Sequence, residues 1–309
     1  MDRVRRLVGV SDDNGNRKEE IPTGKGVGIA IVDTGINTHM DFGVGRQSRI
    51  IAFADFIRKR NSCYDDCGHG THVSGVAAGD GAASHGKYAG IAPGAGIVAI
   101  KALNEMGNGK IKDVLSSFEW IIANKEKYNI RIVNISMGSG DETLYDENCK
   151  LVLGVEKLWN SGIVVCVAAG NNGPGKSTIT MPGICRSIIT VGCLDDDVEV
   201  IMNNVRVKDY SGQGPTKGCV MKPEVVAPGG NVSSCGNGYR SYVSKSGTSM
   251  ATPVVSGLIA LVLEKYPSLS NKQIKKILNL SALDAGKDKS KQGWGRIHID
   301  NMIKFAGLF

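Results

Sequence analysis

The stretch GVGIAIVDTG, residues 26–35, is an almost unbroken apolar run that ends in an aspartate and a glycine. Continuous rather than alternating hydrophobicity predicts a strand buried on both faces, as in a parallel sheet covered by helices. Four more runs have this character: GIVAIKAL from Gly96, IRIVNISM from Ile130, GIVVCVAA from Gly162 and SIITVGC from Ser187. Helical patterns alternate with them at residues 112–124, 148–160, 252–265 and 271–280. This order predicts an α/β fold with a doubly wound, mostly parallel sheet sandwiched by helices.

The composition is typical of a chain that folds around a large core. Its 309 residues are 41% hydrophobic and 22% charged, and its 41 glycines suit many tight turns between strands and helices. Since no Pro-rich or Gly/Ser-rich linker divides the sequence, we expect one domain over residues 26–309, preceded by an N-terminal arm at residues 1–25. Within the arm, SDDNGNRKEE at residues 11–20 is expected to be poorly ordered.

Charge and cysteine usage limit the partners and the compartment. The net charge is +7, but the basic residues are scattered without an aromatic and basic repeat, so we expect no nucleic-acid partner. We also expect no membrane partner, because no apolar run reaches the roughly 18 residues that a span needs. The N-terminus has no signal-peptide core, and the eight cysteines are too sparse for a disulfide scaffold. Reduced thiols in the cytoplasm are therefore predicted, with secretion the alternative if a leader has been removed.

Three segments place a reactive side chain beside glycine: AIVDTG with Asp33, GHGTHVSG with His69 and SGTSMATP with Ser249. Asp33 ends a predicted strand, and His69 lies between two glycines that leave its ring accessible. Ser249 stands where a turn enters an apolar helix, so its backbone N–H is unpaired and near the positive end of the helix dipole. Each segment alone has an ordinary alternative: a ligand-binding aspartate, a structural histidine, which is the role expected for His72, and a helix N-cap.

Two other kinds of site are weighed against these residues. A zinc cluster of Cys63, Cys67, His69 and His72 has the right residue types, but its spacing is tighter than that of a typical finger. A nucleotide site at Asp33 needs a phosphate-binding glycine loop directly after the first strand, and DTGINTH is not one. Both alternatives are disfavoured.

The three segments decide the function through their order. Asp, His and Ser follow one another as in subtilisin, and IVDTGI, HGTHVSG and GTSMATP each resemble a motif of the subtilisin-like serine protease (subtilase) family. The similarity extends from about Gly26 to Asp300 and includes the closing segment GWGRIHID. The resemblance implies a serine endopeptidase that acts through an acyl-enzyme with the triad Asp33, His69 and Ser249. A catalytically silent subtilase-fold binding protein, a pseudoprotease, is the alternative.

The resemblance also implies the rest of the active site. In VAAGNNG, Asn171 matches the oxyanion donor of subtilases. The partner is a peptide or protein substrate, bound as an extended strand. The residues matching the flanking segments are Gly107, Asn108 and Gly109 on one side and Ser136, Met137 and Gly138 on the other.

The substrate preference and the oligomeric state are less determined. A P1 pocket near Met137 and residues 170–182, without an acidic residue, predicts apolar or large neutral P1 side chains. The bond between Met181 and Pro182 matches a position that is often cis in the family, although the sequence does not assign the isomer. The oligomeric state is left open.

The cofactor expectation is that the chemistry requires none. A structural calcium ion stays open with Asp41 as one ligand, although GDGAASHGKYAG shows no obvious cage of oxygen ligands around it. In these respects the chain is closest in character to intracellular, bacterial-type subtilases. Cys67 lies two residues before His69, so its alkylation is expected to block peptide hydrolysis sterically.

Overall fold

The computed structural model describes residues 1–43, 45–138, 149–202 and 205–309. Its centre is a seven-stranded sheet in the order β2-β3-β1-β4-β5-β6-β9, with every neighbouring pair parallel. The strands are β1 (Gly28–Asp33), β2 (Ile50–Asp55), β3 (Gly96–Lys101), β4 (Ile130–Ile135), β5 (Val164–Ala168), β6 (Ile189–Cys193) and β9 (Val225–Ala227). The predicted strands and the predicted fold class are confirmed.

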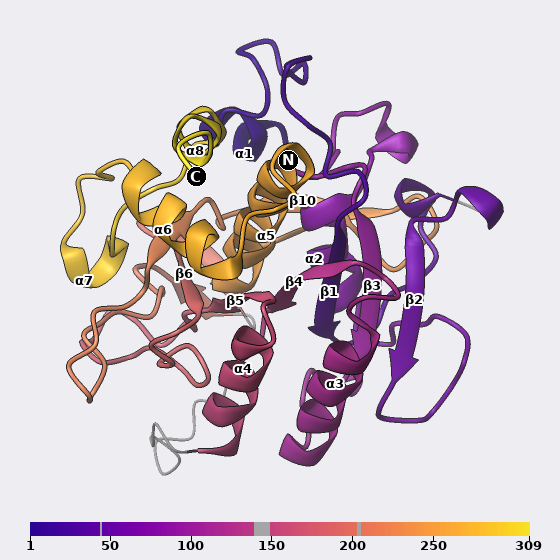
Figure 1. Cartoon of the computed structure of the whole chain (residues 1–309), viewed down its shortest axis with the longest axis horizontal. Coiled ribbons are helices and arrows are strands. Elements are labelled where there is room, and N and C mark those ends of the chain that lie inside the picture. The colour runs from indigo at the N-terminus through magenta and orange to yellow at the C-terminus, as the bar shows by residue number, and fades with distance from the viewer. Residues whose placement is uncertain (44, 139–148, 203–204) are drawn as a thin grey trace.

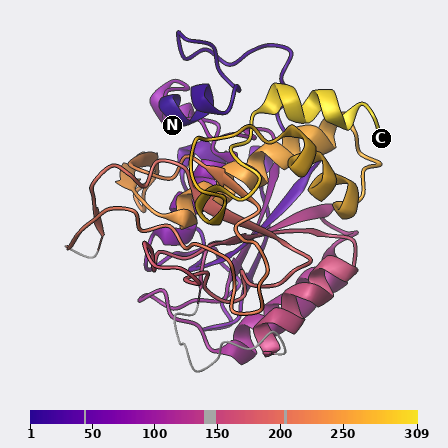
Figure 2. The same cartoon turned by 90° about the vertical axis from the view of Figure 1, so that its left-hand side faces the viewer.

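Two pairs of helices cover the sheet. One pair is α2 (His69–Ala78) with α5 (Thr248–Lys265), and the other is α3 (Ile111–Asn124) with α4 (Lys150–Asn160). Figure 2 shows the strands passing between α3 and α4 below and the orange and yellow helices above. Strands buried on both faces explain why their sequences are continuously apolar.

α5 is the central helix of the core. It is long and apolar enough to span a membrane by length and composition alone, but 83% of that window is buried in the protein. It packs against β4, β5, β6 and β9 as well as α2. We therefore interpret α5 as a core helix, and it carries Ser249 in its first turn.

Shorter elements surround this sandwich. The remaining helices are α1 (Asp2–Leu7), α6 (Asn271–Ser281), α7 (Lys289–Gln292) and α8 (Ile299–Ala306). Two antiparallel hairpins are β7 (Val200–Met202) with β8 (Val205–Val207) and β10 (Val232–Cys235) with β11 (Tyr242–Lys245). The 3-10 turns are η1 (Met40–Phe42), η2 (Gly45–Gln47) and η3 (Ala82–Ser84). None of these elements was among the predicted ones except α6.

The N-terminal arm packs onto the body of the molecule. Val4, Val8 and Val10 are buried and belong to the main core, and the Val8 carbonyl accepts a hydrogen bond of 2.9 Å from the Ile299 N–H at the start of α8. Figure 1 shows α1 beside α8 at the top of the molecule. The expectation that residues 11–20 are poorly ordered is wrong, because Ser11 is buried and forms a bridge with Arg17. The boundary between residues 1–25 and 26–309 stays a prediction.

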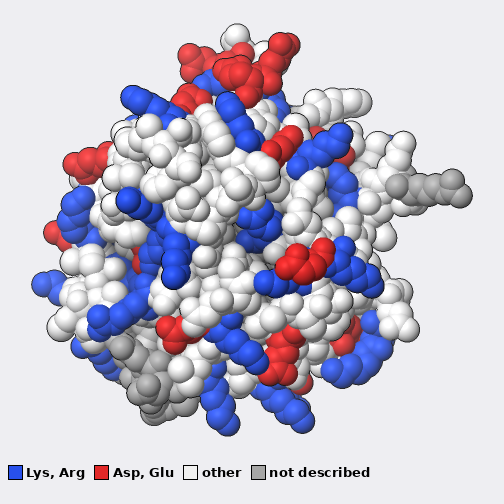
Figure 3. All heavy atoms as spheres, in the orientation of Figure 1, with Lys and Arg blue, Asp and Glu red and all other residues white. Residues whose placement is uncertain are grey.

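The surface is electrostatically mixed on the face that Figure 3 shows, where basic and acidic side chains alternate. All eight cysteines lie in the described part of the chain and are unpaired. Four of them are buried, including Cys166, whose thiol pKa is raised by burial to about 12.

Candidate active site

The three motif segments meet at the edge of the sheet where the parallel strands end. Asp33 is the last residue of β1, His69 the first of α2, and Ser249 the second of α5. A pocket of about 360 Å³ is lined by His69, Asn171 and Ser249 together with Met202 and Lys245 from the two hairpins. The carboxyl edge of a parallel sheet is where α/β proteins commonly build their sites.

Asp33 and His69 form the shortest contact in the site. His69 Nδ1 lies 2.7 Å from Asp33 Oδ1, which also accepts the Thr34 N–H at 2.8 Å. Asp33 is fully buried, and its Oδ2 has no partner among the described residues. Burial disfavours a charged imidazole, but the neighbouring Asp33 carboxylate outweighs this, so the pKa of His69 lies above its usual 6.5. The pair therefore holds a tautomer with Nε2 free to accept a proton.

Ser249 points toward β4 rather than toward the imidazole. Its Oγ donates to the Ser136 carbonyl at 2.9 Å, and Ser136 Oγ donates back to the Ser249 carbonyl at 3.0 Å. In the described part of the chain no hydrogen bond joins Ser249 Oγ to His69. Both residues line the same pocket, and catalytic hydrogen bonds are often formed only in the substrate complex, so we expect Ser249 Oγ to leave the Ser136 carbonyl when substrate binds.

Asn171 is oriented by the start of α5. Its Oδ1 accepts both the Thr248 N–H at 3.0 Å and the Thr248 hydroxyl at 3.1 Å. Asn171 lines the pocket shared with Ser249, and with its amide oxygen engaged by Thr248 the amide nitrogen is the group left to donate. The Ser249 N–H belongs to the first turn of the helix, where backbone donors have no intrahelical acceptor. Two donors are thus available to one developing negative charge.

The two segments predicted to flank the substrate border a second pocket of about 320 Å³. Gly107, Asn108 and Gly109 line one side of it, and Met137 and Gly138 line the other. The remaining lining residues are Leu103, Ile111, Val114, Phe118, Leu151, Met181 and Pro182. Among these described residues none is charged, which makes the pocket suitable for apolar side chains.

Glycine is required on each side of this pocket. A Cβ on Gly109 would lie 2.6 Å from a Leu103 methyl, and one on Gly138 would lie 2.1 Å from Thr180 Oγ1. The Met181–Pro182 peptide bond is cis. Ser136, the sixth predicted residue, is 3% exposed and contacts Ser249 from behind.

Comparison with known proteins places these features in one family. The subtilase family model matches residues 24–295. The chain is 38% identical to the serine protease AprX of Bacillus subtilis strain 168, over 97% of this chain and 72% of that protein. It belongs to the subtilase family. Subtilisin DY of Bacillus licheniformis is 36% identical over 90% of each chain, and the structure of sphericase has a TM-score of 0.76 at 30% identity, covering 96% of this chain and 97% of that one.

This subtilase is a serine endopeptidase and hydrolyses peptide bonds without a catalytic cofactor. Calcium binding is common in the family. In this chain, however, the Asp41 carboxylate does not fit as a ligand, because both of its oxygens accept hydrogen bonds. Tyr242 Oη lies 2.8 Å from each, the Ala83 N–H donates to Oδ1 at 2.9 Å, and the Cys235 thiol lies 3.6 Å from Oδ2. A calcium ion takes six to eight oxygen ligands, whereas among the described residues the other possible ligands gathered at Asp41 are the nitrogen of His39 and the sulfur of Cys235.

The zinc alternative also finds no support in the described residues of this subtilase. Cys63, Cys67, His69 and His72 do not gather, and the group whose ligand atoms come within 4.8 Å of one another is His39, Asp41 and Cys235. His39 is already engaged, since its Nδ1 accepts the Asp41 N–H and its Nε2 donates to the Ser241 carbonyl.

His72 is structural, as predicted. It is buried, its Nε2 lies 3.0 Å from the Val232 carbonyl, and burial lowers its pKa to about 3.

Several residues of the site were not predicted. Thr248 orients Asn171 and lies inside the quoted GTSMATP motif, so its place beside Ser249 was the available signal. Met202 and Lys245 reach the pocket from hairpins that no pattern indicated. Cys67 is partly exposed two residues before His69, and its N–H donates to Asp65. The effect of its alkylation stays a prediction.

Proposed function

We propose that this subtilase cleaves peptides through an acyl-enzyme formed on Ser249, with His69 as general base and Asp33 as its orienting partner. Ser249 Oγ attacks the scissile carbonyl carbon while its proton passes to His69 Nε2. The oxygen of the tetrahedral intermediate accepts hydrogen bonds from the Ser249 N–H and the Asn171 amide. His69 then gives the proton to the leaving amine, the C–N bond breaks, and a water molecule repeats the sequence to release the acid.

The observation that carries this proposal is the 2.7 Å contact between Asp33 and His69 beside a pocket that His69, Asn171 and Ser249 share. This contact explains why His69 acts as the base. A base with a raised pKa accepts the serine proton more readily, and the buried Asp33 carboxylate stabilises the imidazolium that forms.

We also infer the substrate preference from the apolar pocket. A peptide lying as a strand between Gly107–Gly109 and Ser136–Gly138 presents alternate side chains to it. Apolar or large neutral side chains are therefore favoured on the acyl side of the scissile bond, P1 included. A peptide library cleaved chiefly after Lys or Arg would contradict this preference.

The compartment we propose is the cytoplasm. Support comes from eight unpaired cysteines, of which Cys63, Cys67 and Cys149 are partly exposed and Cys219 is exposed. Exposed thiols persist in a reducing compartment. Cell fractionation with thiol titration of the native protein tests this, and an enzyme recovered outside the cell would contradict it.

The experiment for the chemistry compares the wild-type protein with Ser249→Ala on a peptide mixture, with products identified by mass spectrometry. Loss of the nucleophile is expected to lower kcat by roughly 10⁶-fold, a magnitude measured in subtilisin itself. Asn171→Ala is expected to lower kcat by about 10²- to 10³-fold, again as measured in subtilisin. A wild-type protein that binds peptides and releases no product would instead indicate a catalytically silent binding protein.

A further inference from the structure

Lys101 is a fully buried charge directly behind the catalytic pair. It is the last residue of β3 and lies in register with Asp33 on β1 and with Asp55 on β2. Burying an ammonium group is unfavourable unless it is paired and fully hydrogen-bonded. The contacts of Lys101 must therefore account for its presence.

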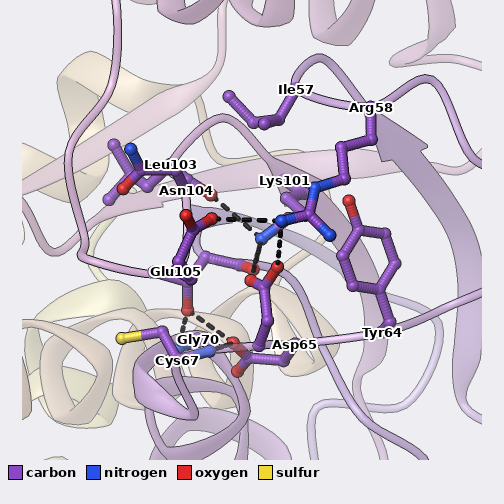
Figure 4. Close-up of polar contacts among 12 residues, drawn as sticks. Ile57, Arg58, Tyr64, Asp65, Cys67, Gly70, Lys101, Leu103, Asn104 and Glu105 are labelled. Carbon is purple, nitrogen blue, oxygen red and sulfur yellow. Dashed lines mark hydrogen bonds and ion pairs between the residues drawn. The ribbon is translucent and has the colours of Figure 1, made fainter.

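Its three ammonium protons go to three different parts of the site. Lys101 Nζ donates to the Thr34 carbonyl at 2.6 Å, to Asp66 Oδ1 at 2.6 Å and to the Leu103 carbonyl at 3.1 Å. The ring of Tyr64 lies 4.8 Å from the same nitrogen. Figure 4 shows Lys101 between Leu103 on one side and the Tyr64 ring on the other. A primary ammonium has three donors, so no proton is left over.

The Thr34 contact leads to Asp33 and His69. Thr34 follows Asp33 directly and donates its N–H to Asp33 Oδ1 at 2.8 Å. Its hydroxyl accepts the Gly70 N–H at 2.9 Å and donates to Asp65 Oδ1 at 2.8 Å. Gly70 follows His69, and Asp65 accepts the Gly68 N–H in front of it. By binding the Thr34 carbonyl, Lys101 therefore holds a residue that contacts both the Asp33 side chain and the backbone beside His69.

The other two contacts lead toward the substrate. Leu103 donates its N–H to the Asp33 carbonyl at 3.1 Å and precedes the turn that ends in Gly107–Gly109. Asp66 also lies 3.5 Å from Arg58, and Arg58 lies 3.3 Å from Glu105 inside that turn. Alternating charges thus connect Glu105 in the turn beside the substrate, through Arg58 and Asp66, to the buried ammonium group. Figure 4 shows Glu105, Arg58 and Lys101 close together.

We propose that Lys101 is a positioning residue for the hydrolytic reaction, tying the end of β1, the segment before His69 and the start of the substrate-flanking turn to one buried point. The proposal rests on the proposed triad. Lys101 acts through Thr34, Asp66 and Leu103, and it sets the alignment of Asp33 with His69.

The test compares Lys101→Met with a matched control, Lys222→Met. Lys222 is equally buried and lies 2.7 Å from Glu224, but it stands before β9 at the far edge of the sheet. Each variant loses one buried ammonium group that is paired with a carboxylate. We expect Lys101→Met to lower kcat about 10- to 100-fold with KM changed less than about 3-fold, because small misplacements of catalytic groups are costly. Lys222→Met is expected to lower Tm and leave kcat within about 3-fold.

The pH profile of kcat/KM adds a readout that loss of packing alone would not move. The charged groups that face His69, which are Asp33, Asp65 and Lys245, are kept in every variant. Lys101→Met leaves the Asp66 carboxylate without its nearest cation, so the acid limb moves to higher pH. Asp66→Asn leaves the Lys101 cation without its carboxylate, so the limb moves to lower pH. Both shifts are expected to be a few tenths of a pH unit.

Three results would overturn the proposal. One is a folded Lys101→Met with kcat and pH profile like wild type, and another is an equal loss of kcat in Lys222→Met at equal loss of Tm. The third concerns Asp66→Asn, which is used if Lys101→Met does not fold, because the Asp66 side chain is partly exposed. An acid limb of Asp66→Asn at the wild-type pH would contradict the positioning role of Lys101. Labelling of Ser249 by a fluorophosphonate probe in the wild type separates this failure from a failure of the triad itself.

Discussion

Two buried aspartates of this subtilase, Asp33 and Asp41, have the same burial and opposite surroundings. Asp33 shares one oxygen between His69 and the Thr34 N–H and keeps the other without a partner in the described structure. Asp41 has donors on both oxygens, from Tyr242, Ala83 and Cys235. A carboxylate with a free acceptor oxygen beside a titratable group is suited to catalysis, whereas a carboxylate with donors on both oxygens is suited to a structural role.

The comparison teaches that burial alone does not separate a catalytic carboxylate from a structural one. Both residues are 0% exposed. What differs is whether the hydrogen bonds leave an oxygen and a movable proton available. Asp33→Asn and Asp41→Asn each replace a carboxylate by an amide of the same shape, so neither changes the packing. Only Asp33→Asn alters a carboxylate that contacts the titratable His69, and the two variants can therefore be compared directly.

The largest expected effect is that of Asp33→Asn on turnover. The amide cannot hold His69 in the tautomer with Nε2 unprotonated, so kcat should fall about 10⁴-fold, the size of loss seen at such positions in other serine proteases. Tm should change little, because the shape of the side chain is kept. Steady-state kinetics with thermal unfolding check this. Retention of more than a tenth of wild-type kcat would remove Asp33 from the triad.

Asp41→Asn should show the reverse pattern. The amide nitrogen would face donors that now point at a carboxylate oxygen, which costs about 1–3 kcal/mol of unfolding free energy. Turnover should stay within about 3-fold of wild type, because Asp41 contacts no group of the triad. Denaturant unfolding and peptide hydrolysis measured on the same preparation are the readouts. A loss of kcat with unchanged stability would break the comparison.

The acid limb of the pH profile of kcat/KM should shift in Asp33→Asn and stay unchanged in Asp41→Asn. Only neutral His69 can accept the serine proton, and its pKa is raised by Asp33 against the effect of burial. The wild-type acid limb should therefore lie above pH 6.5. In Asp33→Asn the residual activity should have its limb at or below that pH, because burial and Lys245 lower the pKa of His69 and only the weaker effect of Asp65 still raises it. Asp41→Asn should leave the limb in place. A limb that is equal in all three proteins would contradict the electrostatic role of Asp33.

The smallest expected effect is that of Tyr242→Phe. It removes the hydroxyl that lies 2.8 Å from both Asp41 oxygens and should cost about 1 kcal/mol of stability. Thermal unfolding with and without a chelator then tests the calcium question at this corner. Because both oxygens of Asp41 already accept hydrogen bonds from the protein, the difference in Tm between the wild type and Tyr242→Phe should be the same with and without calcium. A variant rescued by added calcium would show that Asp41 can bind the ion.

The sequence predicted what depends on local patterns. Strands buried on both faces gave continuous apolar runs, and the reactive residues lay in short motifs with glycine. β2 was missed although its sequence, IIAFAD, is also an apolar run; it is an edge strand whose side chains are mostly only partly buried. The packing of the arm was missed because Val4, Val8 and Val10 find their partners far along the chain.

The contacts that organise the site were equally beyond the sequence. In GIVAIKAL, Lys101 is a single charge at the end of an apolar run, which is ordinary for an exposed strand end. Its partners Thr34 and Asp66 lie 67 and 35 residues away, so only the fold shows that the charge is buried and saturated. The rotamer of Ser249 toward Ser136 is likewise a property of packing.

The most direct test of the assembled triad is labelling by a fluorophosphonate probe under reducing conditions, with the modified residue mapped by mass spectrometry. The wild-type protein should be labelled on Ser249 alone, and labelling should vanish in Ser249→Ala while Asp41→Asn is labelled normally. A folded wild-type protein that is not labelled, or is labelled on another residue, would contradict the assignment of Ser249 as the nucleophile.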